Sequence, residues 1–234
     1  NAARFIGGLD PVIIPRSSGY IGVLIDDLVT KGTNEPYRMM TSRAEFRLLL
    51  RQDNADERLT PIGYEVGLIS EERMEHLRKK LAAIDEEVTR LNSTFVGDSD
   101  EVQSLLLKYE STPNNSGVSL ADLIKRPELD YEKISSIDKN RPELSFEVRE
   151  EAEIRIKYEG YIERQKRQVK QAEKLEHKKI PETITYDEIS GLRIEAAQKL
   201  AAVRPQTIGQ ASRISGVSPA DISVLQVYIK SMEG

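Results

Sequence analysis

The sequence predicts a mainly helical protein: a helical bundle followed by a small helix-turn-helix-like module. Three observations predict this fold. Apolar residues recur at steps of three and four over residues 70–92, helix-capping sequences precede several short apolar segments, and charged residues make up 31% of the chain against 6% for aromatic residues. Such a composition is typical of helices with long solvated faces.

Residues 1–34 are punctuated by glycine and proline and contain one apolar stretch, Tyr20–Val29. The stretch is apolar enough to be buried, and Gly32 follows it as a plausible residue to end a helix. Asp26 and Asp27 are adjacent within it. Because neighbouring residues of a helix point in different directions, we do not expect these two carboxylates to form a catalytic acid/base pair.

The segment Glu35–Leu59 contains no lysine but five arginines: Arg38, Arg43, Arg47, Arg51 and Arg58. Ser42 and Glu45 have the spacing of a capping box, which predicts a short helix over about 43–51 with Arg43, Arg47 and Arg51 on one face. A guanidinium group binds phosphates and carboxylates in the same planar geometry. The cluster therefore either binds an anion or forms ion pairs within the protein. We expect Arg38 and Arg58 to form such internal ion pairs.

Ser70 can cap a long helix that runs to about residue 92, with acidic residues in its first turn. Its apolar seam is formed by Met74, Leu77, Leu81, Ile84, Val88 and Leu91. A partner helix must cover this seam, from within the chain as the simpler solution or from another subunit. A second long helix is predicted from about 145 to 176, and antiparallel packing of the two would bury both stripes.

Shorter elements follow from local capping signals. Ser119 with Asp122 predicts a helix over Leu120–Ile124. After Pro181 we expect a helix ending at Val203, a helix over 208–214 capped by Thr207, and a last helix that starts with the capping box Ser218-Pro219-Ala220-Asp221 and runs to about Lys230. The predicted domain boundaries place residues 1–34, 35–180 and 181–234 in three parts.

Composition and motifs exclude several classes of site. The chain has no cysteine, and its two histidines, His76 and His177, are far apart in charged surroundings, so we expect no metal site and no His-based triad. It has no glycine-rich nucleotide loop, no membrane-length apolar run and no secretory signal, so a cytoplasmic protein is expected. The chain begins at Asn1 without a methionine, and we expect it to be part of a longer protein.

A second basic region lies on the predicted 145–176 helix, beside Tyr158 and Tyr161. It contains Lys157, Arg164, Lys166, Arg167, Lys170, Lys174, Lys178 and Lys179, with Glu159, Glu163, Glu173 and Glu176 between them. The formal net charge of −5 argues against a general polyanion binder but not against a local basic face. These residues either form i,i+4 pairs on a solvated helix or follow a phosphate backbone. The last helix is mostly apolar, so we do not expect it to read DNA bases.

Five segments of the sequence resemble one known family, in the same order along the chain. The segments are Tyr20–Leu28, Glu35–Leu59, Lys157–Ile162, Ser190–Leu192 and Ile208–Pro219. Together they are similar to the C-terminal part of the glucose-inhibited division protein A family, and the resemblance covers essentially the whole chain. It implies a FAD- and NADH-dependent enzyme that acts with a GTPase partner to form the 5-carboxymethylaminomethyl group on the wobble uridine of tRNA.

The resemblance also implies roles for the parts of this chain. Residues 1–34 would be the edge of a flavin-binding domain, and the helical remainder would bind tRNA and the GTPase without taking part in catalysis. We therefore expect Arg43, Arg47, Arg51, Lys157, Arg164, Lys166 and Arg167 to contact tRNA. We expect Gln210, Arg213 and Gln226 to contact the partner, and the full-length protein to be a homodimer. The alternative is a purely structural or protein-interaction domain without RNA contact.

Overall fold

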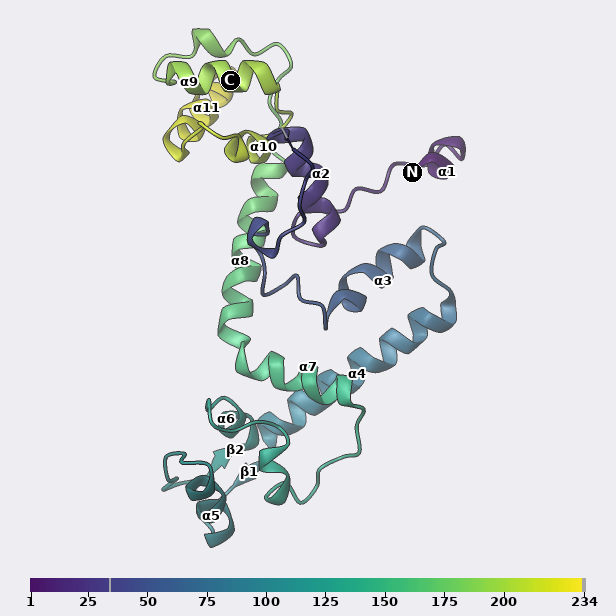
Figure 1. Ribbon diagram of the computed structural model, residues 1–234, viewed down its shortest axis with the longest axis vertical. Coiled ribbons are helices and arrows are strands. Elements are labelled where there is room, and N and C mark those ends of the chain that lie inside the picture. The colour runs from purple at the N-terminus through teal and green to yellow at the C-terminus, as the bar shows by residue number, and fades with distance from the viewer. Residues whose placement is uncertain (34, 233–234) are drawn as a thin grey trace. The chain divides into compact units, whose positions relative to one another are not determined.

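The structure, a computed structural model, describes residues 1–33 and 35–232 and confirms the mainly helical fold (Figure 1). The chain divides into two compact units. Residues 1–50 and 165–234 form the first unit, and residues 51–164 form the second. The domain boundaries expected from the sequence stay predictions.

The N-terminal part of the first unit contains two helices, α1 (Ala2–Ile6) and α2 (Tyr20–Thr30), and the short 3-10 turn η1 (Thr41–Arg43). Gly32 follows α2 with φ +66°, in the left-handed region, as its position in the sequence suggested. Gly22 is needed in α2 because a Cβ there would lie 2.4 Å from the carbonyl oxygen of Ile14. The segment before α2 therefore packs directly on the helix backbone.

The expected burial of the Tyr20–Val29 stretch is only partly right. Val23 is buried and joins Ala44 and Leu50 in a small core. Ile25 and Val29, by contrast, are 52% and 63% exposed. The buried face of α2 includes two polar residues, Asp27 and Thr30, beside Gly22 and Val23, and the apolar Ile25 and Val29 face outward.

The helix predicted over 43–51 is wrong. After η1, Ala44 adopts an extended backbone with φ −92° and ψ 130°, and a turn at residues 46–50 follows. Glu45 does not close a capping box on Ser42, because its carboxylate binds Arg16. Long-range contacts have therefore overridden the local capping signal, and Arg43, Arg47 and Arg51 do not share a helical face.

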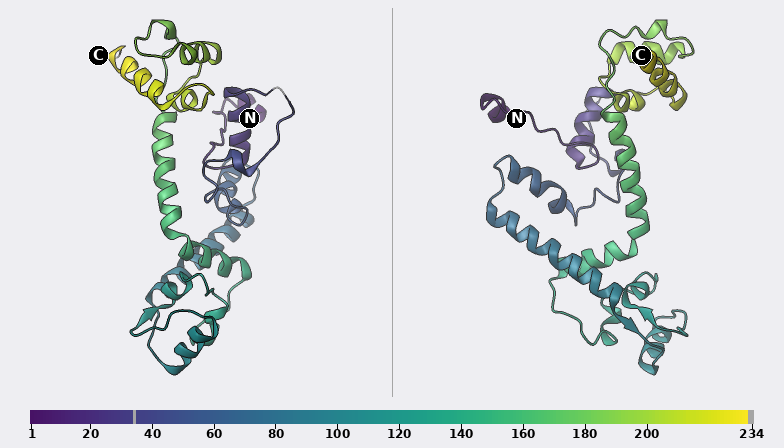
Figure 2. Two further views of the ribbon diagram at one scale, coloured as in Figure 1. Left: turned by 60° about the vertical axis from the view of Figure 1, so that its left-hand side comes forward. Right: turned by 180° about the vertical axis from the view of Figure 1, so that it is seen from behind.

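The C-terminal part of the first unit contains most of α8 (Glu159–Glu176), the turn η3 (Tyr186–Glu188), and the helices α9 (Ile194–Val203), α10 (Ile208–Arg213) and α11 (Pro219–Met232). Both views of Figure 2 show α9, α10 and α11 gathered beyond the end of α8. Their core contains Leu200, Ile208, Leu225 and Ile229, all fully buried.

The predicted caps of this module are confirmed. The hydroxyl of Thr207 accepts a hydrogen bond from the backbone N–H of Gln210 at 3.1 Å. Ser218 and Asp221 form the reciprocal capping box, in which Asp221 accepts from the Ser218 N–H at 2.7 Å. Short-range signals thus set both helix starts.

The second unit contains α3 (Ala55–Glu65), α4 (Glu71–Ser93), α5 (Asp100–Lys108), α6 (Leu120–Ile124), η2 (Lys133–Ser136) and α7 (Phe146–Lys157). Two short strands, β1 (Phe95–Val96) and β2 (Val118–Ser119), pair antiparallel with Phe95 opposite Ser119. The sequence analysis did not predict this ribbon, because two residues are too few to show an alternating pattern.

The seam predicted on α4 is covered from within the chain. Ser70 caps α4 as expected, and Leu77, Ile84 and Leu91 are buried. Within the second unit α4 packs against α3, α6 and α7. The internal partner favoured by the sequence is therefore confirmed.

The second long helix differs from its prediction in two ways. It is broken at Tyr158 into α7 and α8. The expected antiparallel packing is also wrong: Lys80 pairs with Glu147 near the start of α7, and Asp85 pairs with Arg155 near its end. Charge pairs in the same order along both helices show that α4 and α7 run in the same direction.

The adjacent leucines of α5 provide a test of this packing. Leu106 is fully buried and Leu107 is 81% exposed. We expect Leu106→Ala to lower the free energy of unfolding by roughly 2–5 kcal/mol, and Leu107→Ala to change it by less than about 0.5 kcal/mol. Chemical denaturation followed by circular dichroism measures both, and equal effects would contradict the placement of α5.

Candidate nucleic-acid interface

Arg16 lies at the centre of the charge network of the first unit, although the sequence analysis did not single it out. Its guanidinium group is buried and binds Asp26 at 3.0 Å, Asp27 at 2.9 Å and Glu45 at 2.8 Å. Asp26 and Asp27, expected to point apart, therefore converge on one cation. Their role here is ion pairing rather than acid/base chemistry.

Asp27 is the most buried carboxylate of this network, with 2% of its side chain exposed. Burial by itself would raise its pKa, but hydrogen bonds from Lys31, Tyr37 and Arg16 outweigh this effect and lower the pKa to about 2. The carboxylate is therefore ionised at neutral pH and stabilises the fold through its cations.

Arg43 belongs partly to the same network. Its guanidinium carbon lies 4.5 Å from the ring centre of Tyr37, and the group is 3.7 Å from Asp27. The side chain remains 42% exposed. Arg43 thus braces the segment that follows α2 while part of it faces solvent.

Arg47 has a different environment. It lies in the turn at residues 46–50, which is fixed to α8 because the N–H of Leu49 donates to the side-chain oxygen of Gln165 at 3.0 Å. Arg47 itself is exposed and forms no ion pair with any residue that the structure describes. Of the three arginines predicted to grip an anion, it is the one without an internal partner.

Arg51 is in the second unit and is engaged there. It binds Glu151 at 2.9 Å and Asp53 at 2.8 Å, and only 17% of its side chain is exposed. Burial is the main cause that raises the pKa of Glu151, and the hydrogen bond that protonated Glu151 donates to Asp53 is a further cause. This arrangement has the character of an internal brace.

The first-unit part of α8 carries a basic surface. Between residues 165 and 176 there are four lysines and arginines and two glutamates. Half-buried Val169 and Ala172 mark its packed side. The exposed residues Arg167, Lys170 and Lys174, here called the α8 basic face, recur at steps of three and four on the opposite side.

The α8 basic face has no internal charge partners among residues 1–33 and 35–232: none of its three side chains takes part in an ion pair. Glu176, one of the two nearby glutamates, is instead bound to Arg213 and Thr207. The local positive charge is therefore open to solvent, where it can attract an anionic ligand.

The remaining residues predicted to contact tRNA are distributed between the units. Lys157, in the second unit, pairs with Glu153 at 2.9 Å. Arg164 is exposed at the start of α8, near the exposed rings of Tyr158 and Tyr161 in the same unit. Lys166 is exposed and belongs to the first unit.

The three residues expected to contact a protein partner also differ. Arg213 is largely buried, with 16% of its side chain exposed, and binds Asp26 at 2.7 Å as well as Glu176. The side-chain oxygen of Gln210 accepts from the Gln206 N–H at 2.7 Å. Gln226 is half-buried on α11. Arg213 joins α10 to α2 and α8, so its first role is structural.

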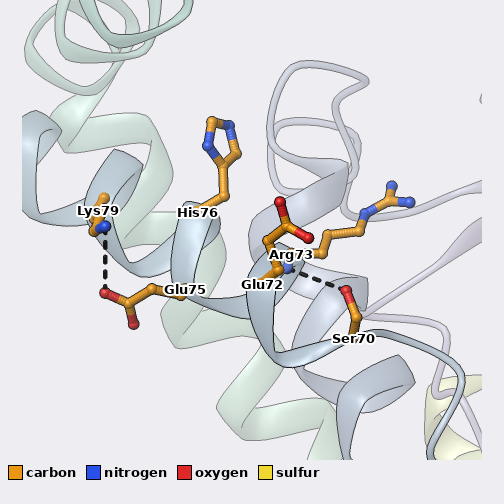
Figure 3. Close-up of a pocket in the computed structure, with 6 residues that line it drawn as sticks. All are labelled: Ser70, Glu72, Arg73, Glu75, His76 and Lys79. Atoms are coloured by element: carbon orange, nitrogen blue, oxygen red, sulfur yellow. Dashed lines mark hydrogen bonds and ion pairs between the residues drawn. The ribbon is translucent and has the colours of Figure 1, made fainter.

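The described residues contain no other strong candidate for a catalytic or metal site. A surface concavity of about 550 Å³ at the start of α4 is lined by six exposed residues: Ser70, Glu72, Arg73, Glu75, His76 and Lys79 (Figure 3). All come from one helix and its cap, so the concavity has a single wall. No group of three His, Cys, Asp or Glu residues could hold a metal, and no helix could span a membrane, within the described chain.

Comparisons with known proteins agree with the predicted family. Residues 71–166 match the model described as "tRNA modifying enzyme MnmG/GidA C-terminal helical domain", and residues 168–234 match the one described as "tRNA modifying enzyme MnmG/GidA C-terminal helical bundle". The chain belongs to the MnmG/GidA family of tRNA modifying enzymes. The resemblance found in the sequence is thereby confirmed.

The relatives of the MnmG/GidA family show how much of such an enzyme this chain represents. It is 59% identical to the tRNA uridine 5-carboxymethylaminomethyl modification enzyme MnmG of Caldicellulosiruptor saccharolyticus, over 98% of this chain and 37% of the relative. It is 58% identical to the enzyme of the same name from Lachnoclostridium phytofermentans, over 99% of this chain and 37% of that relative. The chain thus spans a little over a third of the length of these curated relatives.

Solved structures show the same relation. The structure of Aquifex aeolicus GidA in its form II crystal is similar with a TM-score of 0.79 and 39% identity, over 98% of this chain and 36% of that one. The form I crystal gives a TM-score of 0.75. The helical region of this chain is therefore the C-terminal helical part of a MnmG/GidA enzyme.

Arg43 and Arg47 allow internal ion pairing to be distinguished from binding of an external anion. We expect Arg43→Gln to lower the free energy of unfolding by about 1 kcal/mol, because it removes the contact with Tyr37 and the pair with Asp27. Arg47→Gln should leave stability within about 0.5 kcal/mol. Urea denaturation of both variants measures this, and a larger loss for Arg47→Gln would show an internal role for that residue.

Asp27 predicts a defined dependence of stability on pH. Since its folded pKa of about 2 lies below the ordinary value of 3.8, its stabilisation is complete above about pH 4 and is lost as the pH falls through 2. We expect Asp27→Asn to lower the free energy of unfolding by roughly 2–4 kcal/mol at pH 7. Denaturation at pH 7 and pH 2.5 should show a smaller difference at the acidic pH, and a constant difference would contradict the assignment.

Proposed function

We propose that this chain is the tRNA-binding region of a MnmG/GidA enzyme, and that the α8 basic face contacts tRNA phosphates. The observation that supports this proposal is the set of exposed cations Arg167, Lys170 and Lys174, which have no ion-pair partner among the described residues of a chain whose net charge is negative. Cations without internal partners release counterions from a phosphate backbone when they bind it, which favours binding at low salt.

Arg47 extends the proposed contact surface within the first unit. The turn that carries it is held to α8 at Gln165, two residues before Arg167. Arg43 and Arg51 are less suited to phosphate binding, because each already faces carboxylates of its own unit. The proposal therefore retains Arg47, Arg164 and Arg167 of the arginines and lysines predicted from the sequence and gives less weight to the others.

A purely structural region is the alternative, and the paired arginines favour it. Arg16, Arg51 and Arg213 all bind carboxylates inside their units. If the exposed cations of α8 had no ligand, this chain would serve only to support other parts of the enzyme or its partners. Variants that replace the α8 cations by uncharged residues distinguish the two alternatives. They should lower RNA affinity without changing stability if the face binds RNA, and should leave RNA affinity unchanged if the region is purely structural.

The activity of the full-length enzyme remains part of the proposal. The family resemblance implies FAD and NADH as cofactors, a GTPase partner, a homodimer and a cytoplasmic location, with formation of the 5-carboxymethylaminomethyl group on the wobble uridine. Dinucleotide folds hold such cofactors through a glycine-rich loop, and these 234 residues contain no loop of that kind. No flavin step is therefore assigned to residues of this chain, whose proposed task is to position RNA.

A triple variant tests the α8 basic face. We expect Arg167→Gln, Lys170→Gln and Lys174→Gln together to weaken tRNA binding by the 234-residue chain at least about tenfold at low salt. The slope of log affinity against log salt should fall by roughly 2–3 in magnitude, about one for each phosphate group that is no longer bound. Filter binding or fluorescence anisotropy over a salt series gives both values.

The matched control removes the same charge elsewhere. Lys79→Gln, Lys108→Gln and Lys139→Gln change three exposed lysines of the second unit. We expect this variant to keep most of the tRNA affinity and most of the salt slope. Equal losses of tRNA affinity in the two triple variants would show that binding depends on net charge alone and not on the α8 basic face. Absence of tRNA binding by the unchanged chain would reject the proposal.

A further inference from the structure

A cavity lies in the first unit between the segment that follows α8 and the loop that joins α9 to α10. Its volume is about 550 Å³, within the range of small-ligand sites. Two backbone hydrogen bonds fix its walls: the Ile180 N–H donates to the Gln206 carbonyl at 2.9 Å, and the Ile208 N–H donates to the Lys178 carbonyl at 2.9 Å. The cavity is thus held open by the fold itself.

Arg204 stands at this cavity in an unusual backbone conformation. It ends α9 with φ 52° and ψ 57°, in the left-handed region where glycine is the usual residue. The following Pro205 favours an extended residue before it, so the conformation is unfavourable for a second reason. Strain of this kind persists where the surrounding structure fixes it and is frequent at binding sites.

The side chain of Arg204 is oriented across the cavity. Its Nη1 donates to the carbonyl oxygen of Ile184 at 3.3 Å, on the opposite wall. The rest of the guanidinium group has no carboxylate partner among the described residues, and the side chain as a whole is exposed. The cavity therefore presents a fixed cation with hydrogen-bond donors to spare.

Tyr186 lines the same cavity and is buried, with 3% of its surface exposed. Its hydroxyl forms no hydrogen bond with any residue in the described part of the chain. Burial raises the pKa of this hydroxyl, while the charge of Arg204 acts in the opposite direction. The hydroxyl is not among the buried atoms that lack a partner, so it is open to the cavity and can form a hydrogen bond with a ligand there.

The chemistry of the walls defines the ligand. Pro181 and Pro205 provide apolar surface, Lys179 and Arg204 provide positive charge, and Glu182 provides an acceptor. A phosphate alone would leave the apolar surface unused. A planar base that carries a phosphate can contact the apolar surface, the positive charge and the acceptor together. Unpaired bases of RNA are recognised in this way, by stacking and by hydrogen bonds to their exposed edges.

We propose that this cavity binds one unpaired nucleotide of an RNA strand, with its phosphate at Lys179 and Arg204, its base on half-buried Pro181 and an edge of the base toward the Tyr186 hydroxyl. The inference rests on the proposed function, because the RNA is taken to be tRNA. The cavity would be a second point of contact with the RNA, in addition to the α8 basic face, and would recognise a single nucleotide rather than a phosphate backbone.

Titration of the 234-residue chain with single nucleotides tests this site directly. The probes are AMP, CMP, GMP and UMP, with inorganic phosphate as the comparison, followed by two-dimensional NMR. We expect at least one nucleotide to shift the amide signals of residues 179–186 and 204–207 and to bind at least tenfold more tightly than phosphate. Unlabelled tRNA should compete with it. Absence of shifts, or phosphate binding as tightly, would overturn the proposal.

Two variants distinguish binding from folding. Arg204→Gly removes the guanidinium group but suits the left-handed backbone, so we expect unchanged or higher thermal stability with nucleotide affinity reduced at least tenfold. Tyr186→Phe removes only the hydroxyl and should keep stability while weakening binding severalfold. Lys199→Gln, an exposed change in α9, is the control and should alter neither. If Arg204→Gly and Tyr186→Phe both kept full affinity, the site would be wrongly assigned.

The cavity and the α8 basic face can fail independently. Nucleotide binding without any tRNA binding would reject the proposed function, and because tRNA would then not compete for the cavity, it would also overturn RNA as the source of the nucleotide. Salt-dependent tRNA binding without nucleotide shifts at residues 179–186 would reject the cavity and leave the proposed function intact. The α8 triple variant should keep its nucleotide affinity within twofold.

Discussion

The buried guanidinium group of Arg16 is the interaction on which the first unit depends. It pairs with three carboxylates, Asp26, Asp27 and Glu45, and so ties α2 to the segment around residue 45. Asp26 is shared with Arg213 of α10. Each of these charges would be costly to bury alone, and each is stabilised because the others are present. The N-terminal and C-terminal parts of this unit are thereby held together by one connected set of charges rather than by a large apolar core.

This constraint divides the basic residues of the chain into two kinds. Those bound to buried carboxylates, such as Arg16, Arg51 and Arg213, would have to give up an internal partner to bind a phosphate. Those on exposed surfaces without partners, such as Arg167 and Lys170, give up only solvent. Side chains of the second kind are therefore the better candidates for contact with RNA, whatever their spacing in the sequence suggests.

The sequence predicted what local signals determine. The caps at Ser70, Thr207 and Ser218 and the apolar seam of α4 are all present. It did not predict Arg16, an isolated arginine in a glycine- and proline-rich stretch whose partners lie up to 29 positions away. For the same reason the 43–51 helix was wrong, since Glu45 had the spacing of a cap but the geometry of an ion-pair partner. The left-handed backbone conformation of Arg204 was not predicted either, because no local sequence pattern marks an arginine in that conformation.

The distribution of charge, rather than its sum, explains how an acidic chain can present a basic surface. Net charge counts every ionisable group equally, whereas the potential at the surface depends mainly on groups in contact with solvent. Asp27 and Asp221 each have 2% of their side chains exposed and are paired with arginines inside their unit. These pairs leave the net charge unchanged, so the α8 basic face is positive because its own cations have no ion-pair partner among the described residues. A formal charge of −5 is therefore compatible with strong, salt-dependent attraction of RNA to one face of one helix.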